Sequence, residues 1–191
     1  MILHGLIRKS MTLLFNTVKS CTRCHLSSSD NRLSPTPGRG AKGDYFIVGL
    51  APSWYRINLE KSTDIIMPFG DQKHTSYWLG EVLSEIKWPL EKTYITNVIK
   101  CSLPDNRSPV DKDISACYKL YFFQELCMYR PKIIICLGNL VYDILKVREE
   151  LTHFKLEKVF HHSYIARTPS KYSDWKIQWE QLIEEYGIKK T

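Results

Sequence analysis

The sequence predicts an α/β protein, a three-layer α/β/α sandwich in which helices cover both faces of a central four-stranded parallel sheet. The main observation is an alternation along the chain: short apolar runs rich in β-branched residues are separated by longer segments in which apolar residues recur at helical spacing. A chain of 191 residues can bury such a core as a single domain spanning residues 1–191, and the sequence contains no internal repeat.

Four segments are predicted to form the strands, because each is short, apolar and bounded by turn residues. They are residues 44–50, 94–100, 131–138 and 158–160. Parallel strands bring their carboxyl ends to one edge of a sheet, and open α/β sheets bind their ligands at that edge. We therefore expect functional side chains where these segments end.

Four amphipathic helices are expected at residues 75–86, 113–128, 139–146 and 171–186. Asp113 would lie near the start of the second of these, where a carboxylate suits the helix dipole. A further short helix is expected within residues 1–20, ending at Cys21.

Charge and hydropathy limit the classes of function. Lys and Arg number 27 against 20 Asp and Glu, so the net charge is +7, which suits an anionic partner such as nucleic acid but is equally typical of a solvated surface. No apolar run is long enough to span a membrane, and the first residues lack the apolar core of a signal peptide. We therefore expect a cytoplasmic monomer with no membrane partner.

The six cysteines are more informative, because paired thiols of an intracellular protein indicate metal ligation rather than disulfides. Four of them form two pairs: Cys21 with Cys24, and Cys101 with Cys117. The first pair favours a metal over redox exchange, because a loop rich in Ser, Pro and Gly follows it. The second spacing is too wide for a zinc ribbon, yet zinc and a four-iron cluster both accept four thiolates, so the choice between them stays open. Cys127 and Cys136 lie in apolar segments and are expected to be core thiols.

A second group of residues lies at the predicted strand ends. It comprises the turn Gly49–Pro52, Asn97 and His161, together with Phe69 from a loop. An amide can read the edge of a planar base, an aromatic ring can stack on it, and an imidazole can donate to an oxygen that gains negative charge. The sequence has no Walker loop, no His-Glu-x-x-His and no Gly-x-Ser-x-Gly, which argues against the commonest nucleotide hydrolases, zinc proteases and esterases.

Taken together, the motifs resemble those of the iron-sulfur uracil-DNA glycosylases, usually called families 4 and 5. The similarity rests on these segments: Cys21-x-x-Cys24, Gly49-Leu50-Ala51-Pro52, Pro68-Phe69-Gly70, Tyr94 to Cys101, Asn106 to Pro109, Cys117, Pro131 to Gly138 and His161 to Arg167. Each motif is weak alone, whereas the cysteine spacing and the order of the motifs are specific in combination.

The resemblance implies a cofactor and a DNA partner. A structural 4Fe-4S cluster would be bound by Cys21, Cys24, Cys101 and Cys117. The loop from Ser163 to Lys171 would press against DNA that contains uracil, and Arg167 and Lys171 would be placed for phosphates.

The resemblance also implies how uracil would be held. Its pocket would be lined by Gly49, Leu50, Ala51 and Phe69. Phe69 would stack on the flipped base and Asn97 would bond its edge, while His161 would stabilise the departing uracil anion.

Three departures from the family are visible. Leu50 stands where family 4 has an acidic or amide residue, and His162 replaces the proline of a His-Pro-Ser motif. The loop over residues 53–67 is longer than in the family, so both Asp71 and Asp64 are candidates for positioning the attacking water.

The expected function is that of a monofunctional DNA glycosylase, which flips uracil out of DNA and hydrolyses its glycosidic bond, initiating base excision repair. Other deaminated bases are further candidate substrates. Two alternatives remain open. A glycosylase-like protein altered at Leu50 and His162 would bind DNA or a protein partner without releasing a base. A zinc-stabilised α/β protein with an unrelated ligand would also fit the cysteines.

Overall fold

The computed structural model describes residues 12–27, 35–40, 43–53 and 76–191, which fall into two compact units. The cysteine unit contains the described parts of Met1–Arg39, Gly49–Ile65 and Thr96–Arg130. The histidine unit contains those of Gly40–Val48, Ile66–Ile95 and Pro131–Thr191. The single domain expected from the sequence stays a prediction.

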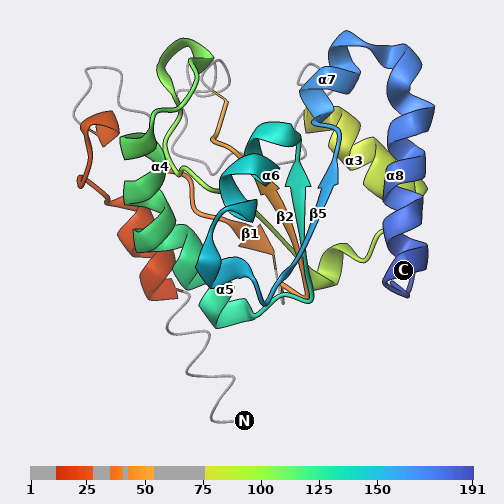
Figure 1. Ribbon diagram of the computed structural model, residues 1–191, viewed down its shortest axis with the longest axis horizontal. Helices are drawn as coiled ribbons and strands as arrows, with labels where there is room; N and C mark the ends of the chain where they lie inside the picture. Colours follow the sequence, from red (N-terminus) through yellow and green to blue (C-terminus); the bar gives the residue numbers. More distant parts are fainter. Residues whose placement is uncertain (1–11, 28–34, 41–42, 54–75) are drawn as a thin grey trace. The chain divides into compact units, whose positions relative to one another are not determined.

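The described strands form a five-stranded sheet in the order β1-β3-β2-β4-β5 (Figure 1). Their bounds are Arg39–Gly40 (β1), Tyr45–Gly49 (β2), Thr93–Asn97 (β3), Ile133–Leu137 (β4) and Lys155–Val159 (β5). β2 is parallel to β4 and β4 to β5, with Ile133 paired to Tyr45 on one side and to Lys155 on the other. The α/β class is confirmed. The fifth strand, absent from the prediction, is the two-residue β1 at the edge beside β3.

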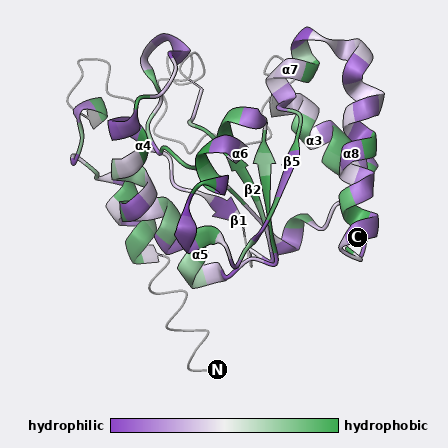
Figure 2. Cartoon of the chain, in the orientation of Figure 1, coloured by the Kyte–Doolittle hydropathy of each residue, from purple (hydrophilic) through white to green (hydrophobic). Residues whose placement is uncertain are grey.

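Burial explains the composition of the strands. Every residue of β2 and β4 is buried, as expected for central strands covered on both faces. β5 is the edge strand next to β4, and it exposes Lys155 and Lys158, which discourage pairing with another chain. Figure 2 accordingly shows β4 as hydrophobic and β5 as largely hydrophilic. Because β5 lacks a continuous apolar run, the sequence located only its end.

The helices of the histidine unit are Ser76–Glu85 (α3), Asn139–Lys146 (α6), His162–Arg167 (α7) and Tyr172–Glu185 (α8). α3, α6 and α8 confirm three predicted helices to within one residue at each end. α3 and α8 contribute to one apolar core, in which Trp175 and Trp179 are fully buried and Trp88 packs edge-on against Trp179 at 5.3 Å.

Residues 162–167 differ from the prediction, because they form helix α7 where a loop was expected. His161 caps this helix: its side chain accepts a hydrogen bond from the Ser163 backbone N–H. Histidine is not among the usual capping residues Ser, Thr, Asp and Asn, so the start of this helix could not be predicted from its capping residue.

The cysteine unit contains residues 12–19 in a helix, which confirms the expected helix before Cys21. Its main helical run comprises Asp111–Cys117 (α4), a π-helical turn at Tyr118–Phe122 (η4) and Phe123–Tyr129 (α5). The sequence predicted this run as one helix. The π turn begins directly after Cys117, and such turns often accompany functional sites.

The two remaining cysteines differ in environment. Cys136 is buried in β4, as predicted, whereas Cys127 is exposed on α5 and the prediction of a core thiol is wrong. The helix explains the error: Leu126 is fully buried, and a step of one residue turns the next side chain about 100° away from the core.

The other described elements are short 3-10 turns at His25–Ser27 (η1), Leu90–Lys92 (η2), Pro104–Asn106 (η3), Glu149–Leu151 (η5) and Pro169–Lys171 (η6). None of the helices in the described ranges is long and apolar enough to cross a membrane.

Candidate functional site

Asn97 is the last residue of β3 and lies against the turn that follows β2. The Val98 N–H donates to the Gly49 carbonyl at 3.0 Å. A Cβ built on Gly49 would come within 2.4 Å of Asn97 Oδ1, so a side chain there would displace the amide. The structure thus brings Gly49 and Asn97 together, as their strand ends predicted. Leu50 and Ala51 follow Gly49 in half-buried positions.

Next to Asn97 lies a buried cation. The Lys100 ammonium donates to Glu125 Oε2 (2.7 Å), Thr96 Oγ1 (2.7 Å) and the Asn97 carbonyl (2.8 Å). Lys100 and Glu125 are 0% and 1% exposed, respectively, so this ion pair is removed from water. The pair was not predicted from the sequence. The one signal was a lysine at the end of the segment 94–100, which was expected to be a buried strand.

His161 lies in the histidine unit, between the end of β5 and the start of α7. Its Nδ1 accepts from the Ser163 backbone N–H (3.1 Å) and lies 2.7 Å from the Ser163 hydroxyl. A backbone N–H can only donate, so Nδ1 carries the lone pair and the proton of the neutral ring is assigned to Nε2. Burial, aided by the charge of Arg167, lowers the pKa of His161 to about 4. The ring is therefore a neutral Nε2–H donor at physiological pH.

His162 and Gly138 pack around the His161 ring. The two imidazoles lie 4.1 Å apart with 30° between their planes. The His162 Nδ1 is buried without a hydrogen-bond partner among the described residues, and burial lowers the pKa of this ring well below its usual value. Gly138 has φ +89°, and a Cβ there would lie 3.2 Å from the His161 Cβ. Gly138 was in a predicted strand, but its role beneath His161 was not foreseen.

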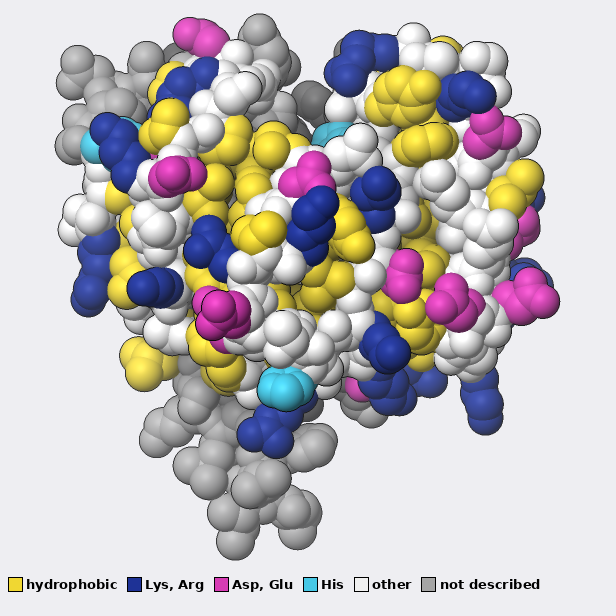
Figure 3. Space-filling model, viewed as in Figure 1, with side chains coloured by type: hydrophobic (Ala, Val, Ile, Leu, Met, Phe, Trp, Pro, Cys, Tyr) yellow, Lys and Arg dark blue, Asp and Glu magenta, His cyan; other side chains and the backbone are white. Residues whose placement is uncertain are grey.

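The three residues predicted to contact DNA differ in whether their side chains already have partners within the protein. Ser163 is engaged with His161, and Lys171 forms an ion pair with Asp174 at 2.8 Å. Arg167, the last residue of α7, makes no ion pair with any residue in the described ranges. Basic and hydrophobic side chains adjoin over α7 and the start of α8 in Figure 3, and the exposed Tyr164 belongs to this helix.

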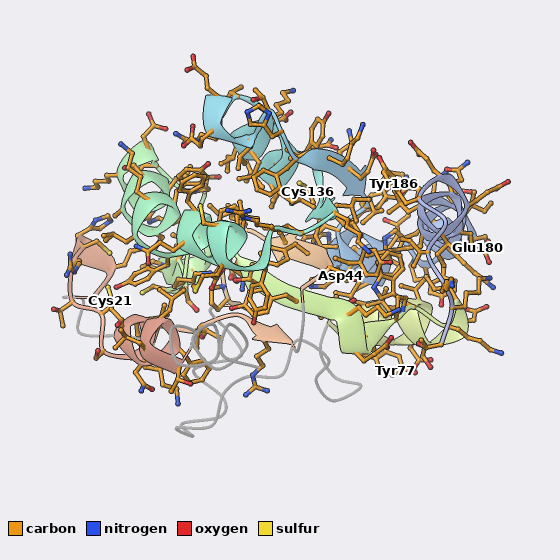
Figure 4. All side chains as sticks on the ribbon, turned by 90° about the horizontal axis from the view of Figure 1, so that it is seen from below. Cys21, Asp44, Tyr77, Cys136, Glu180 and Tyr186 are labelled. Carbon is orange, nitrogen blue, oxygen red and sulfur yellow. The ribbon has the colours of Figure 1, made fainter. Side chains whose placement is uncertain are left out.

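The four predicted metal ligands all belong to the cysteine unit, and none of them forms a disulfide with another described residue. Figure 4 shows Cys21 beside the ribbon that leaves the first described helix. Burial raises the pKa of the Cys117 thiol, and the nearby charges of Cys24 and Cys21 raise it further. The backbone N–H of Lys100 donates to Cys117 Sγ at 3.5 Å, a direction that favours a thiolate.

The surroundings of these thiols suit a metal cluster, although no three His, Cys, Asp or Glu side chains within the described residues already form a closed metal site. The Ser102 hydroxyl is buried without a hydrogen-bond partner in the described part of the chain, and the Tyr121 hydroxyl is buried near Cys21. Ser102 follows Cys101 directly, and Tyr121 lies close enough to Cys21 for that thiol to raise its pKa, after the larger effect of burial. The hydroxyls of Ser102 and Tyr121 lie beside the cysteines and could donate hydrogen bonds to the sulfurs of a cluster.

Asp113 ties the segment between Cys101 and Cys117 to the start of the chain. Its buried carboxylate accepts two bonds from Arg107 (2.7 and 3.1 Å) and one from the Val110 N–H (2.8 Å). His25 Nε2 lies 2.8 Å from the same carboxylate. From the sequence, Asp113 was expected only to suit the helix dipole, whereas in the structure its carboxylate lies at the centre of a hydrogen-bond network.

Phe69, Asp71 and Asp64 lie outside the described residues, so their roles stay predictions. The described residues supply two polar groups, each backed by a glycine: the Asn97 amide over Gly49 and the neutral His161 ring over Gly138. Taken separately, the Asn97 amide of the cysteine unit can donate and accept, and the His161 imidazole of the histidine unit can donate without charge; each is a group that suits a planar heterocycle with carbonyl oxygens.

Comparison with known proteins finds several relatives of the chain. The chain is 31% identical over 131 residues to a type-4 uracil-DNA glycosylase of Archaeoglobus fulgidus, a match that covers 69% of the chain and 61% of the relative. It is 28% identical over 179 residues to one of Sulfurisphaera tokodaii, covering 91% of the chain and 71% of the relative. For one of Thermotoga maritima the identity is 29% over 174 residues, covering 84% and 85%.

The chain thus spans about three fifths of the length of the Archaeoglobus relative. The family pattern described as the uracil DNA glycosylase superfamily matches residues 37–183, which include Gly49, Asn97 and His161. This match covers well over half of the chain, and the protein belongs to the uracil DNA glycosylase superfamily.

Proposed function

We propose that the protein is a uracil-DNA glycosylase that hydrolyses the glycosidic bond between uracil and deoxyribose in DNA. The observation that carries this proposal is the state of His161: a helix cap fixes its tautomer, and burial keeps it neutral. Membership of the superfamily and the type-4 relatives supply the substrate class.

The chemical step follows from that state. As the glycosidic bond loosens, the bonding electrons move onto the base and negative charge builds on a uracil carbonyl oxygen. The Nε2–H of His161 donates to that oxygen, and the bond strengthens as the charge develops. Asn97 reads the amide edge of the base, because its side chain both donates and accepts, which also disfavours cytosine.

The DNA is held mainly through its phosphates. Arg167 can contact phosphate directly, while Lys171 first has to leave Asp174. Phe69 stacks on the flipped base, and Asp71 or Asp64 positions the water that completes hydrolysis. No lysine acts as a nucleophile, so the enzyme is monofunctional and leaves the strand intact. Other deaminated bases that present the same carbonyl and N–H groups are candidate substrates.

We also propose a structural 4Fe-4S cluster on Cys21, Cys24, Cys101 and Cys117. The cluster would supply a covalent cross-link between distant segments of the cysteine unit, and the chemical step does not pass through it. Ser102 and Tyr121 would donate to its sulfurs. Anaerobically purified protein should be brown and contain iron; a colourless protein with one zinc per chain would establish the zinc alternative.

The test of the proposed function is base release from a labelled oligonucleotide with one uracil, scored by alkaline cleavage at the abasic site. We expect release by the wild-type protein and a loss of about a hundredfold or more in His161→Ala and in Asn97→Ala. Folded variants with wild-type rates would refute the site. Tight binding to uracil-containing DNA without release would instead identify a binding protein of glycosylase fold.

A further inference from the structure

The Lys100–Glu125 ion pair has no part in the chemistry above, yet it is the most completely buried charged group next to the candidate site. All three ammonium protons of Lys100 are used: on Glu125, on Thr96 and on the Asn97 carbonyl. The Thr96 hydroxyl donates in turn to Glu125 Oε2 at 2.8 Å. The Lys100, Thr96 and Glu125 side chains are thus bonded to one another, which restricts the geometry of the network.

Stability alone does not account for such a pair. Removing two charges from water costs more than most buried pairs recover, and well-packed apolar side chains of similar volume are often at least as stabilising. The surroundings would permit that exchange, since Phe122 and Leu126 beside the pair are fully buried. Buried pairs of this kind can instead fix one arrangement of the groups they contact.

The group fixed here is the peptide of Asn97. The ammonium contacts its carbonyl, while Gly49 lies beneath its side-chain amide. β3 ends at Asn97, but the backbone pairing continues: the Val98 N–H donates to the Gly49 carbonyl at 3.0 Å and the Ile99 N–H to the Leu50 carbonyl at 2.8 Å. The peptide after Asn97 is thus held through its N–H by the turn after β2 and through its carbonyl by Lys100.

The backbone of Lys100 is hydrogen-bonded within the cysteine unit. Its N–H donates to Cys117 Sγ at 3.5 Å, and its carbonyl accepts from the Thr36 N–H at 2.7 Å. The next residue is Cys101, another of the predicted ligands. One residue thus connects the cysteine site to the amide that reads the base.

We propose that Lys100 and Glu125 are positioning residues that hold Asn97 in its base-reading orientation and relay the order of the cysteine site to it. This inference rests on the proposed function. Neither residue contacts the substrate. Their contribution is expected in the rate of bond cleavage in the bound complex rather than in the affinity for DNA.

The test replaces the whole pair, because a single substitution would leave one buried charge unpaired and could unfold the protein. The double variant Lys100→Met/Glu125→Met removes both charges at similar volume. Its matched control, Lys132→Met/Asp44→Asn, removes an exposed pair of 3.4 Å. We expect both to melt near the wild-type temperature. The buried variant should lose about a hundredfold in single-turnover uracil release, as for a misplaced catalytic group, while its affinity for abasic DNA is unchanged.

Coupling to Asn97 separates positioning from a general structural role. In an Asn97→Ala background the Lys100→Met/Glu125→Met change should produce no further loss of rate, because the group it positions is gone. A full additional loss in that background, or a wild-type rate in the folded double variant, would overturn the proposal.

A second readout does not depend on activity. In protein labelled with ¹⁵N-asparagine, the side-chain NH₂ signals of Asn97, assigned with Asn97→Ala, should shift and broaden in the buried variant and stay unchanged in the exposed-pair control. Unchanged signals would overturn the positioning role. If the wild-type protein released no uracil but these signals moved, the proposed function would fail while the positioning role stood.

Discussion

Asn97 and His161 are both polar side chains set over a glycine, yet they are fixed by opposite means. Asn97 is held through its carbonyl by a buried ion pair. His161 is held by a helix cap and by burial, and within the described residues Arg167 is the charge that lowers its pKa.

The difference follows from the protonation state that each side chain needs for its proposed role. A carboxylate beside an imidazole raises its pKa and favours the charged ring, whereas the proposed step uses the neutral one. An amide has no proton to gain near neutral pH, so charged groups can hold it without altering its state. Within the described residues, the buried charges thus contact the group whose protonation state they leave unchanged.

The largest expected effect comes from disturbing the amide without touching the ion pair. In Gly49→Ala the new methyl group would meet Asn97 Oδ1 at 2.4 Å, and the flexible side chain would move aside. We expect uracil release to fall about a hundredfold with little change in melting temperature. Gly187→Ala is the control: open space surrounds this glycine, but its φ is +57°, so the variant should lose stability and keep its rate. A fully active Gly49→Ala enzyme would show that Gly49 is not needed to keep the Asn97 amide in place.

The second prediction concerns the neutral histidine. The folded pKa of His161 is about 4, against about 6.5 when unfolded, so the unfolded state binds more protons as the pH falls below 6.5. The stability that depends on the neutral ring is fully present above pH 6.5 and is lost as the pH falls toward 4. After allowance for partial exposure of the ring, this loss is about 2 kcal/mol.

Denaturant unfolding at several pH values, compared between His162→Gln and His161→Gln/His162→Gln, isolates this effect, because the His162 ring that contacts His161 is absent from both proteins. The rate of uracil release should also show no inflection near pH 6.5. An inflection there that His161→Gln abolishes would mean that the ring is protonated at neutral pH, and the contrast between the two sites would disappear.

The two sites also differ in how far they could be predicted from the sequence. Gly49 and Asn97 end apolar strands, and strand ends in a parallel sheet meet at one edge, so their proximity was predictable. Glu125 was not, because an inward glutamate on an amphipathic helix has no local signature, and only the folded chain shows that Lys100 reaches it. α7 was not predicted because a histidine caps it. Cys127 was wrongly expected in the core because it lies in an apolar segment, although it follows the buried Leu126 by one residue and therefore faces about 100° away on the helix.

A smaller effect is expected from the turn after His161. His162 is the first residue of α7, a position that favours proline, and the preceding residue has ψ 136°, which proline also prefers. His162→Pro would remove the buried, unpaired Nδ1. We expect it to raise stability by about 0.5–1 kcal/mol with the release rate kept or increased. Reduced activity in a more stable protein would show that the stacked imidazole supports His161.

The smallest effect is expected from removing one of the two Ser163 groups that lie within hydrogen-bond distance of the His161 Nδ1. Ser163→Ala removes the hydroxyl at 2.7 Å but leaves the backbone N–H at 3.1 Å, which alone requires a lone pair on Nδ1. The tautomer should therefore survive, and the release rate should fall only about twofold to fivefold, the value of one ordinary hydrogen bond. Ser163→Thr, which keeps the hydroxyl, is the matched control. A loss comparable to that of His161→Ala would show that the hydroxyl, rather than the helix cap, holds the ring in its active state.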